Sequence, residues 1–151
     1  MGYEDLLIEA EKENLIVKEK PLQAHDGRIK GNRIAIRKDI PTLAEKACVL
    51  AEEIGHYKTT VGDILHQDDV CDKKQENAAR LWAYNRLVGL RGIIDGFLHG
   101  CRNRAELAEY LGVTESFLQN AIDCYKRKYG LCVTVDNYVI YFEPALAVLM
   151  V

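Results

Sequence analysis

The segment from Pro41 to His56 restricts the possible folds of this chain more than any other part of the sequence. Thr42 precedes a run of apolar residues, and Glu45 follows it three positions later, which is typical of a capping box at a helix start. The apolar positions recur every three or four residues, at Leu43, Ala47, Leu50, Ala51 and Ile54. They therefore lie on one face of a helix, and the sequence predicts that this face is buried.

The end of this helix carries acidic and histidine side chains at a spacing used for metal binding. Glu52 and His56 are four residues apart, so their side chains lie one turn apart on the same helix face. In H-E-x-x-H zinc peptidases both ends are histidines and the middle glutamate is the general base. Here Glu53 keeps the place of the base, and Glu52 stands at the first ligand position. A surface pair of Glu and His on an ordinary helix is the competing interpretation.

A third ligand would come from a second helix, which the sequence predicts from about Lys74 to Leu90. Glu76 lies at the beginning of this helix, and thermolysin-type zinc peptidases take a glutamate from a following helix in the same way. Ala79 follows one turn later and is small enough to allow close packing against the first helix. The intervening polar loop contains further candidate ligands, although a solvated loop is the favoured interpretation: Asp63, His66, Asp68 and Asp69.

A glutamate in the first ligand position alters the expected metal chemistry. Zinc held by two histidines and one glutamate keeps one net positive charge, whereas zinc held by Glu52, His56 and Glu76 is neutral. A less positive centre acidifies water less and polarises a peptide carbonyl less. More oxygen ligands also favour competition by Mn²⁺ or Mg²⁺. We therefore expect Zn²⁺, with Mn²⁺ or loss of the metal as the alternatives.

The region before this helix predicts a small sheet. Residues 3–14 have the spacing of a short helix, and a β-branched run follows at residues 15–17. Residues 28–30 and 33–37 flank the dipeptide Gly31-Asn32, which suits a tight hairpin turn. Ile34 and Ile36 alternate with polar residues, which implies one buried face.

The region after Gly100 predicts a helix-turn-helix-like unit. Asn103 caps a helix that runs to Tyr110, and Thr114 caps a second helix that ends at Gly130. Residues 131–135 and 138–142 form a hairpin around Asp136-Asn137. The apolar stretch 145–151 is interpreted as a tail.

The charge of the chain does not favour nucleic-acid binding. The helix that begins at Thr114 would contact DNA in a helix-turn-helix protein, but Glu115 and Asp123 lie where phosphates would approach. The chain has a net charge of −3 and a pI near 5.8. A sequence-specific DNA-binding regulator is therefore less favoured than the two protein-directed functions described below.

The residues 50–57, with Thr60, Glu76 and Ala79, resemble the ImmA/IrrE family of metallopeptidases. The resemblance extends roughly from Leu6 to Gly130. It implies a zinc endopeptidase that acts on a helix-turn-helix repressor encoded by a bacterial mobile element or prophage. It also implies that His56 and Glu76 bind the metal, that Glu53 is the catalytic base, and that the strand at residues 34–36 is the edge to which a substrate peptide adds. Glu52 departs from the family pattern.

Together these patterns predict an α+β protein with a zincin-like two-helix metal centre, a small N-terminal sheet, a helix-turn-helix-like unit and a C-terminal hairpin. We expect a metallopeptidase-like domain at residues 1–99 and the helix-turn-helix-like unit with its hairpin at residues 100–151. The alternative to an active endopeptidase is a degenerate peptidase fold that binds a partner protein as an antirepressor. No apolar run approaches the ~20 residues of a membrane span, and no secretory signal opens the sequence, so a cytoplasmic location is expected.

Overall fold

The computed structural model describes residues 2–60 and 69–151, with residues 69–73 described by their backbone alone. The chain is an α+β protein, as its sequence predicts. It divides into two compact units, Met1–Ala83 and Tyr84–Val151, and the boundary between them falls inside one long helix. Each unit is described by itself.

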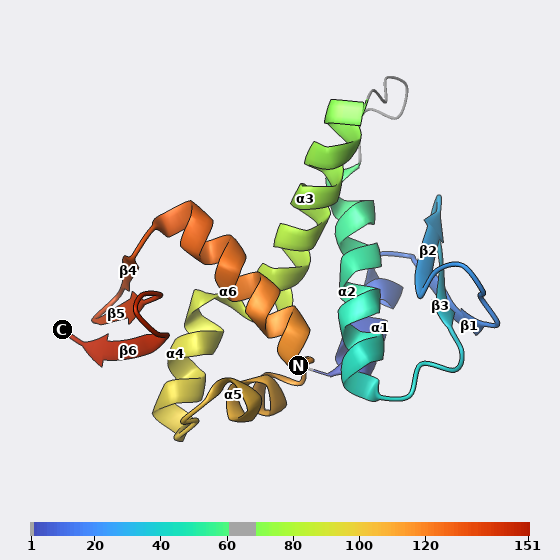
Figure 1. The fold of residues 1–151 in the computed structure, drawn as a ribbon. Helices are drawn as coiled ribbons and strands as arrows, with labels where there is room; N and C mark the ends of the chain where they lie inside the picture. Colours follow the sequence, from blue (N-terminus) through green and yellow to red (C-terminus); the bar gives the residue numbers. More distant parts are fainter. Residues whose placement is uncertain (1, 61–68) are drawn as a thin grey trace. The chain divides into compact units, whose positions relative to one another are not determined.

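The first unit combines a small sheet with helices (Figure 1). Its elements are α1 (Tyr3–Lys12), β1 (Ile16–Lys20), β2 (Gly27–Lys30), β3 (Arg33–Arg37), α2 (Leu43–Thr59) and the first part of α3 (Asp69–Leu87). The largest side chains that are fully buried in this unit are Leu6, Ile34, Ile36, Leu50 and Ile54. They come from α1, β3 and α2, so the core of this unit is shared by these three elements.

The three strands are arranged in the order β1-β3-β2. The predicted hairpin is confirmed, since β2 and β3 are antiparallel and Lys30 pairs with Arg33 across the turn. The prediction that the strand at residues 34–36 forms an edge is wrong. A hairpin leaves the second side of each strand free, and β1 pairs in parallel with that side of β3, with Val17 opposite Ile34. β3 is therefore the central strand, and β1 and β2 are the edges.

Helix α2 begins as predicted and lies very close to α3 (Figure 1). The side-chain oxygen of Thr42 accepts a hydrogen bond of 3.1 Å from the backbone N–H of Glu45, which fixes the helix start. Near the other end, a Cβ added to Gly55 would lie 2.4 Å from the carbonyl oxygen of Ala79. Only a glycine allows this approach, and the close packing expected at Ala79 is confirmed.

The second unit contains the helical part that the sequence predicts, with one more helix. Asn103 and Thr114 cap their helices through their side chains, and Gly112 ends the first of these helices in the left-handed conformation. The additional helix begins at Gly89, whose φ of +68° interrupts the helical path after α3. The elements are α4 (Gly89–His99), α5 (Arg104–Leu111), α6 (Glu115–Tyr129), β4 (Cys132–Val135), β5 (Tyr138–Tyr141) and β6 (Ala147–Met150).

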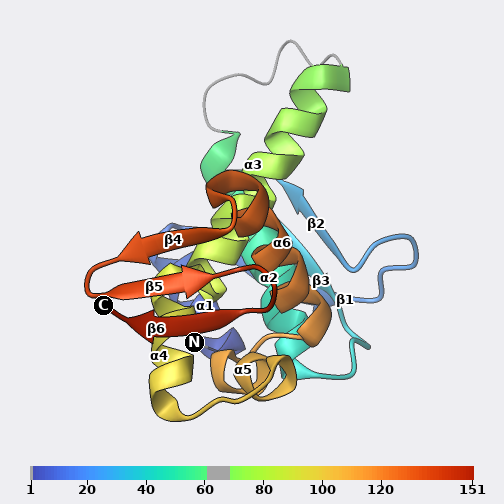
Figure 2. The ribbon, with the colours of Figure 1, turned by 60° about the vertical axis from the view of Figure 1, so that its left-hand side comes forward.

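The C-terminal strands form a sheet in which β5 lies between β4 and β6 (Figure 2). The hairpin of β4 and β5 is confirmed. The interpretation of residues 145–151 as a tail is wrong, because Ala147–Met150 pairs antiparallel with β5, with Leu149 opposite Val139. The hairpin leaves one side of β5 unpaired, and the last apolar residues of the chain occupy it.

Candidate metal centre

The close packing of α2 and α3 brings two of the predicted ligands together. His56 follows Gly55 directly, and Glu76 lies one turn before Ala79, so both side chains leave the helices beside the contact point. The Nε2 atom of His56 lies 3.4 Å from the Oε2 atom of Glu76. The two side chains keep 22% and 43% of their exposure, so a solvent ion can reach them.

The separation of this pair fits two ligands of one zinc ion. Ligand bonds of about 2.0–2.1 Å at tetrahedral angles place two ligand atoms roughly 3.3 Å apart. A direct N–H···O hydrogen bond is usually shorter, at about 2.7–3.2 Å. Imidazole nitrogen and carboxylate oxygen are both donors that zinc accepts. The chemistry and the distance of His56 and Glu76 therefore fit a metal ion.

The third predicted ligand, Glu52, is not assembled with this pair. Among the side chains that the structure describes, no group of three His, Cys, Asp or Glu residues is placed to hold a metal ion. The loop candidates Asp63, His66 and Asp68 lie outside the described residues, as does the side chain of Asp69. The described residues thus provide two ligands that fit a metal and a third acidic side chain nearby.

Glu52 lies in an environment that disfavours its charge. Burial raises the pKa of Glu52 above its usual value, and the negative charges of Glu76 and Asp26 raise it further. The positive charge of Arg80 acts in the opposite direction. Arg80 also pairs with Glu76, with 3.5 Å between Nη2 and Oε1. Arg80 is therefore the main counter-charge of this acidic group.

Arg80 was not identified from the sequence, although a signal for it exists. It follows Glu76 by four residues, which is the spacing of an ion pair along a helix. Its influence on Glu52, however, depends on the contact between α2 and α3, and this contact is not visible in a local pattern.

Glu53 is placed beside the edge of the sheet. Burial raises the pKa of Glu53 to about 7, and the negative charges of Glu52 and Glu76 contribute to the same shift. A Cβ added to Gly27, the first residue of β2, would lie 3.2 Å from Oε1 of Glu53. The same Cβ would lie 2.6 Å from Cγ1 of Val49, so the missing side chain at Gly27 leaves room for both Val49 and the carboxyl group next to an edge strand. A carboxyl group with a pKa near neutrality is suited to general acid–base catalysis.

Two ion pairs fix α2 to the rest of the first unit. Lys46 pairs with Glu19 of β1, and Lys58 pairs with Glu13 after α1, each with an N···O distance of 2.5 Å. One pair lies near each end of α2. They restrain the helix that carries Glu52, Glu53 and His56 against the sheet and against α1.

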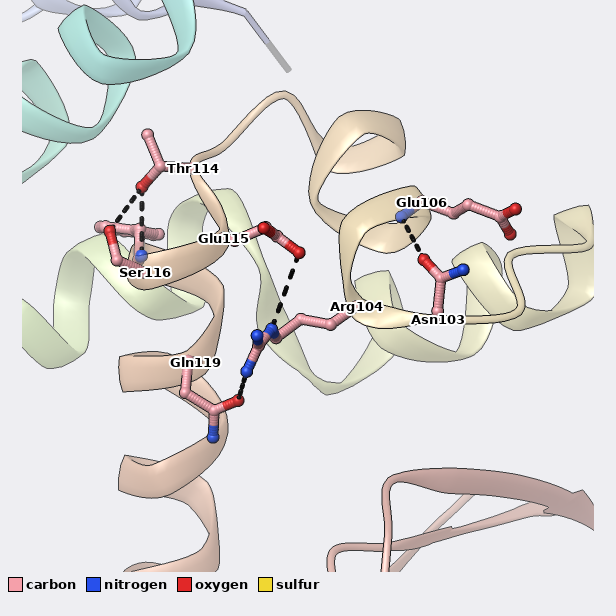
Figure 3. A network of polar contacts seen from close by, with 8 residues as sticks. Asn103, Arg104, Glu106, Thr114, Glu115, Ser116 and Gln119 are labelled. Carbon is pink, nitrogen blue, oxygen red and sulfur yellow. Dashed lines mark hydrogen bonds and ion pairs between the residues drawn. The ribbon is translucent and has the colours of Figure 1, made fainter.

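Polar residues at the starts of α5 and α6 form hydrogen bonds and an ion pair with one another (Figure 3). Arg104 donates a hydrogen bond of 2.7 Å to Gln119 and lies 3.8 Å from Glu115. Gln119 in turn donates to Asp123 at 2.9 Å. In a helix-turn-helix protein the first residues of the second helix, which is α6 here, would contact DNA. Their internal contacts and two carboxylates do not favour that use here.

The helix pair that carries His56 and Glu76, together with the adjacent small sheet, has the arrangement expected of a zincin-like fold. The family model of peptidase family M78, the IrrE N-terminal-like domain, matches residues 10–123. The chain belongs to this family, as the resemblance around His56 implies. No curated protein and no solved structure matches the chain significantly. In the part of the chain that the structure describes, no helix has the length and apolar character needed to cross a membrane.

Proposed function

We propose that the chain is a metal-dependent endopeptidase that acts on a helix-turn-helix repressor of a bacterial mobile element or prophage. The observation that carries this proposal is the separation of 3.4 Å between His56 and Glu76. In this proposal His56 and Glu76 bind Zn²⁺, Glu52 is the third ligand, and Glu53 is the catalytic residue. The family supports a peptidase that takes a protein substrate.

The chemistry of the proposed reaction is divided between the metal and the chain. Zinc, when bound, supplies Lewis-acid polarisation of the scissile carbonyl. Glu53 accepts a proton from the attacking water on its carboxylate and then donates this proton to the leaving amide nitrogen. In the metal-free chain the pKa of this carboxyl group is about 7, so it can both accept and release a proton near neutral pH.

The substrate peptide would add to β2. Within the described residues β2 pairs with β3 alone, so its second side offers unpaired N–H and C=O groups. Gly27 places this strand beside the carboxyl group of Glu53. An extended peptide that pairs with β2 would pass the proposed catalytic residue, as in other cases of recognition by strand addition.

Metal content measured by elemental mass spectrometry tests the proposal first. The purified chain, supplied with zinc, is expected to retain near-stoichiometric zinc, and the His56→Ala variant is expected to lose it. The zinc-loaded chain should then cleave a purified helix-turn-helix repressor of the same mobile element, and Glu53→Gln should abolish this cleavage. Zinc retention by His56→Ala, or equal cleavage by Glu53→Gln, would contradict the proposal.

A second candidate is a degenerate peptidase that binds its partner without cutting it. The observation that favours it is Glu52, which replaces the expected histidine and, among the described side chains, joins no three-residue metal group. Stoichiometric binding of the repressor without cleavage would support this candidate. A DNA-binding regulator, the third candidate, would show a steep salt dependence of duplex affinity.

A further inference from the structure

The outer face of the N-terminal sheet is positively charged. Side chains alternate between the two faces of a strand, and in β3 the buried Ile34 and Ile36 mark the face that packs against the core. The strand register places the opposite set on the outer face. Five exposed cations belong to this outer set, contributed by all three strands: Lys18, Lys20, Arg28, Lys30 and Arg33.

A hollow lies among these cations. Its volume is about 290 Å³, and the apolar residues Ile16, Ile34 and Ala35 contribute to its lining along with the five cations. Ala35 is on the central strand, and its partners in the register are Lys18 on one side and Arg28 on the other. Because alanine is small, the centre of the sheet is recessed between two long cationic side chains.

Among the described residues, the acids nearest to this face pair with other cations. Glu19 lies on the other face of β1, where it pairs with Lys46. Asp26 and Asp39 pair with Arg37. Among the described residues, none of the five cations forms an ion pair. In a chain with a net charge of −3, the described residues thus place five cations that form no ion pair among themselves or with described acids on one face of the sheet.

The position of β2 connects this face with the candidate site. Gly27 at the start of β2 lies against Glu53, and Arg28 and Lys30 follow on the same strand. A peptide strand that pairs with β2 sends alternate side chains to each face of the sheet. Those on the outer face would lie opposite Arg28 and Lys30, with Cβ atoms about 4.5–5.5 Å apart. Opposite charges at such positions stabilise a strand pair, and like charges destabilise it.

We propose that Arg28 and Lys30 are specificity-determining residues that select a substrate segment with acidic side chains at alternate positions. This inference rests on the proposed function, since it takes β2 as the strand to which the substrate adds. The remaining cations of the outer face, Lys18, Lys20 and Arg33, strengthen the attraction from across the hollow.

An acidic peptide suits this face better than a nucleic acid. Surfaces that bind single-stranded nucleic acid generally stack bases on aromatic side chains, and the outer positions of β1, β2 and β3 carry no aromatic residue. The free edge of β2 supplies backbone hydrogen bonds, which an extended peptide can use in full. The chain as a whole is acidic and does not attract a polyanion over long distances.

Fluorescence anisotropy of labelled peptides tests the inference on the whole 151-residue chain without metal. Three short peptides are compared, with threonine alternating with glutamate, glutamine or lysine. The glutamate peptide is expected to bind about tenfold more tightly than the glutamine peptide at low salt, and high salt is expected to reduce the difference. The double variant with Arg28→Glu and Lys30→Glu is expected to reverse the preference toward the lysine peptide.

Lys12→Glu is the control for charge reversal, because it reverses one cation at an exposed position of α1 in the same unit, which is half the charge change of the double variant. It should leave the preference for the glutamate peptide within about twofold. If the double variant does not fold, as judged by its melting curve, Arg28→Gln and Lys30→Gln are measured singly. Each of these single variants is expected to lower the affinity for the glutamate peptide and to leave the affinity for the glutamine peptide unchanged.

Equal affinity for the glutamate and glutamine peptides would overturn the inference. So would duplex DNA that displaces the glutamate peptide and loses affinity in the same variants. The proposed function fails separately. If the zinc-loaded chain cleaves a repressor but shows no preference for acidic peptides, only this inference is wrong. If acidic peptides bind as expected and nothing is cleaved, the proposed catalytic activity is wrong and the selection by Arg28 and Lys30 stands.

Discussion

Both units pack two helices through a glycine, but the two contacts are built from different atoms. Gly55 of the first unit faces a backbone carbonyl, that of Ala79, and beside this contact His56 and Glu76 lie 3.4 Å apart. Gly96 of the second unit faces the end of the Leu107 side chain. A Cβ added to Gly96 would lie 2.2 Å from Cδ1 of Leu107. The first contact fixes the separation of two helices that carry titratable groups, whereas the second can adjust. The first unit therefore holds its side chains in a fixed geometry at the place where a reaction would need it.

The carboxylates of the two units differ in the same way. In the second unit Glu106 accepts a hydrogen bond from the backbone N–H of Arg102, and Asp123 accepts one from the side-chain amide of Gln119. In the first unit Glu52 and Glu53 are half-buried beside Glu76, and their pKa values are raised. Like charges gathered in a partly desolvated place reduce stability, and such places are typical of functional sites. The comparison supports the proposed site in the first unit and a mainly structural use of these polar groups in the second.

The largest effect on the free energy of unfolding is expected when alanine replaces the glycine at each of the two helix contacts. Gly55→Ala should lower the free energy of unfolding by about 2–3 kcal/mol, because the new methyl group meets a backbone oxygen that cannot move alone. Gly96→Ala should cost less than about 1 kcal/mol, because a leucine side chain can rotate away and alanine favours the helix. Urea denaturation of both variants measures the difference. Equal losses would show that the contacts are alike.

A smaller loss is expected from the buried tyrosine of the second unit. The Tyr125 hydroxyl accepts a hydrogen bond from Gly89 N–H at 3.2 Å and donates one to Asn85 at 3.0 Å. Tyr125→Phe removes both and should cost about 1–2 kcal/mol in the free energy of unfolding at pH 7. A change below about 0.3 kcal/mol would mean that these bonds contribute no net stability.

The same residue predicts a dependence on pH. Burial raises the pKa of Tyr125 well above its usual range, so folding favours the neutral hydroxyl. Its contribution to stability is complete below the unfolded pKa of about 10 and is lost as the pH rises toward the folded value. The stability difference between the parent chain and Tyr125→Phe should therefore narrow above about pH 10. A constant difference up to pH 11 would contradict this.

Restoring the family pattern sharpens the comparison at the metal centre. Glu52→His adds a second imidazole and leaves one net positive charge on a bound zinc ion. We expect zinc to bind about tenfold more tightly, measured by calorimetry against the parent chain. The His56→Ala variant of the same protein should lose this gain. Equal or weaker binding by Glu52→His would count against Glu52 as a ligand position.

The smallest change in the free energy of unfolding is expected when a carboxylate is neutralised in each unit. Glu53→Gln should raise the free energy of unfolding of the metal-free chain by about 1 kcal/mol at pH 8, because it removes a partly buried charge beside Glu52 and Glu76. Glu115→Gln is the matched control in the second unit, where the exposed carboxylate pairs with Arg104. It should change stability by less than about 0.5 kcal/mol. A loss of stability in Glu53→Gln would reverse the contrast between the units.

Local signals in the sequence predicted the features that depend on neighbouring residues. Side chains of Thr42, Asn103 and Thr114 cap the helices that they were expected to cap, and Gly31 lies in the turn between β2 and β3. These features involve atoms within a few residues of each other, so a short pattern is sufficient to identify them. The place of His56 on α2 follows similarly from helical spacing, whereas its approach to Glu76 depends on the contact between α2 and α3.

Features that depend on distant segments were missed or wrong. The central position of β3 depends on β1, and β6 depends on the unpaired side of β5. The role of Gly27 beside Glu53 depends on how α2 packs against the sheet. The helix α4 was missed because the helix predicted from about Lys74 to Leu90 was extended past Gly89, where α4 begins. Such pairings depend on which strand edges and helix faces are still unpaired after the local helices and hairpins have formed. A short sequence pattern does not contain this information.

The cations of β1 and β2 also affect how copies of the chain meet. An edge strand with unpaired backbone groups tends to join a second edge, and lysine at an edge is a common protection against this. Lys18 and Lys20 lie on one edge strand, and Arg28 and Lys30 lie on the other. Two copies that approach edge to edge bring like charges together and repel. The sheet therefore resists joining another copy of itself while its edge remains available to a strand of opposite charge.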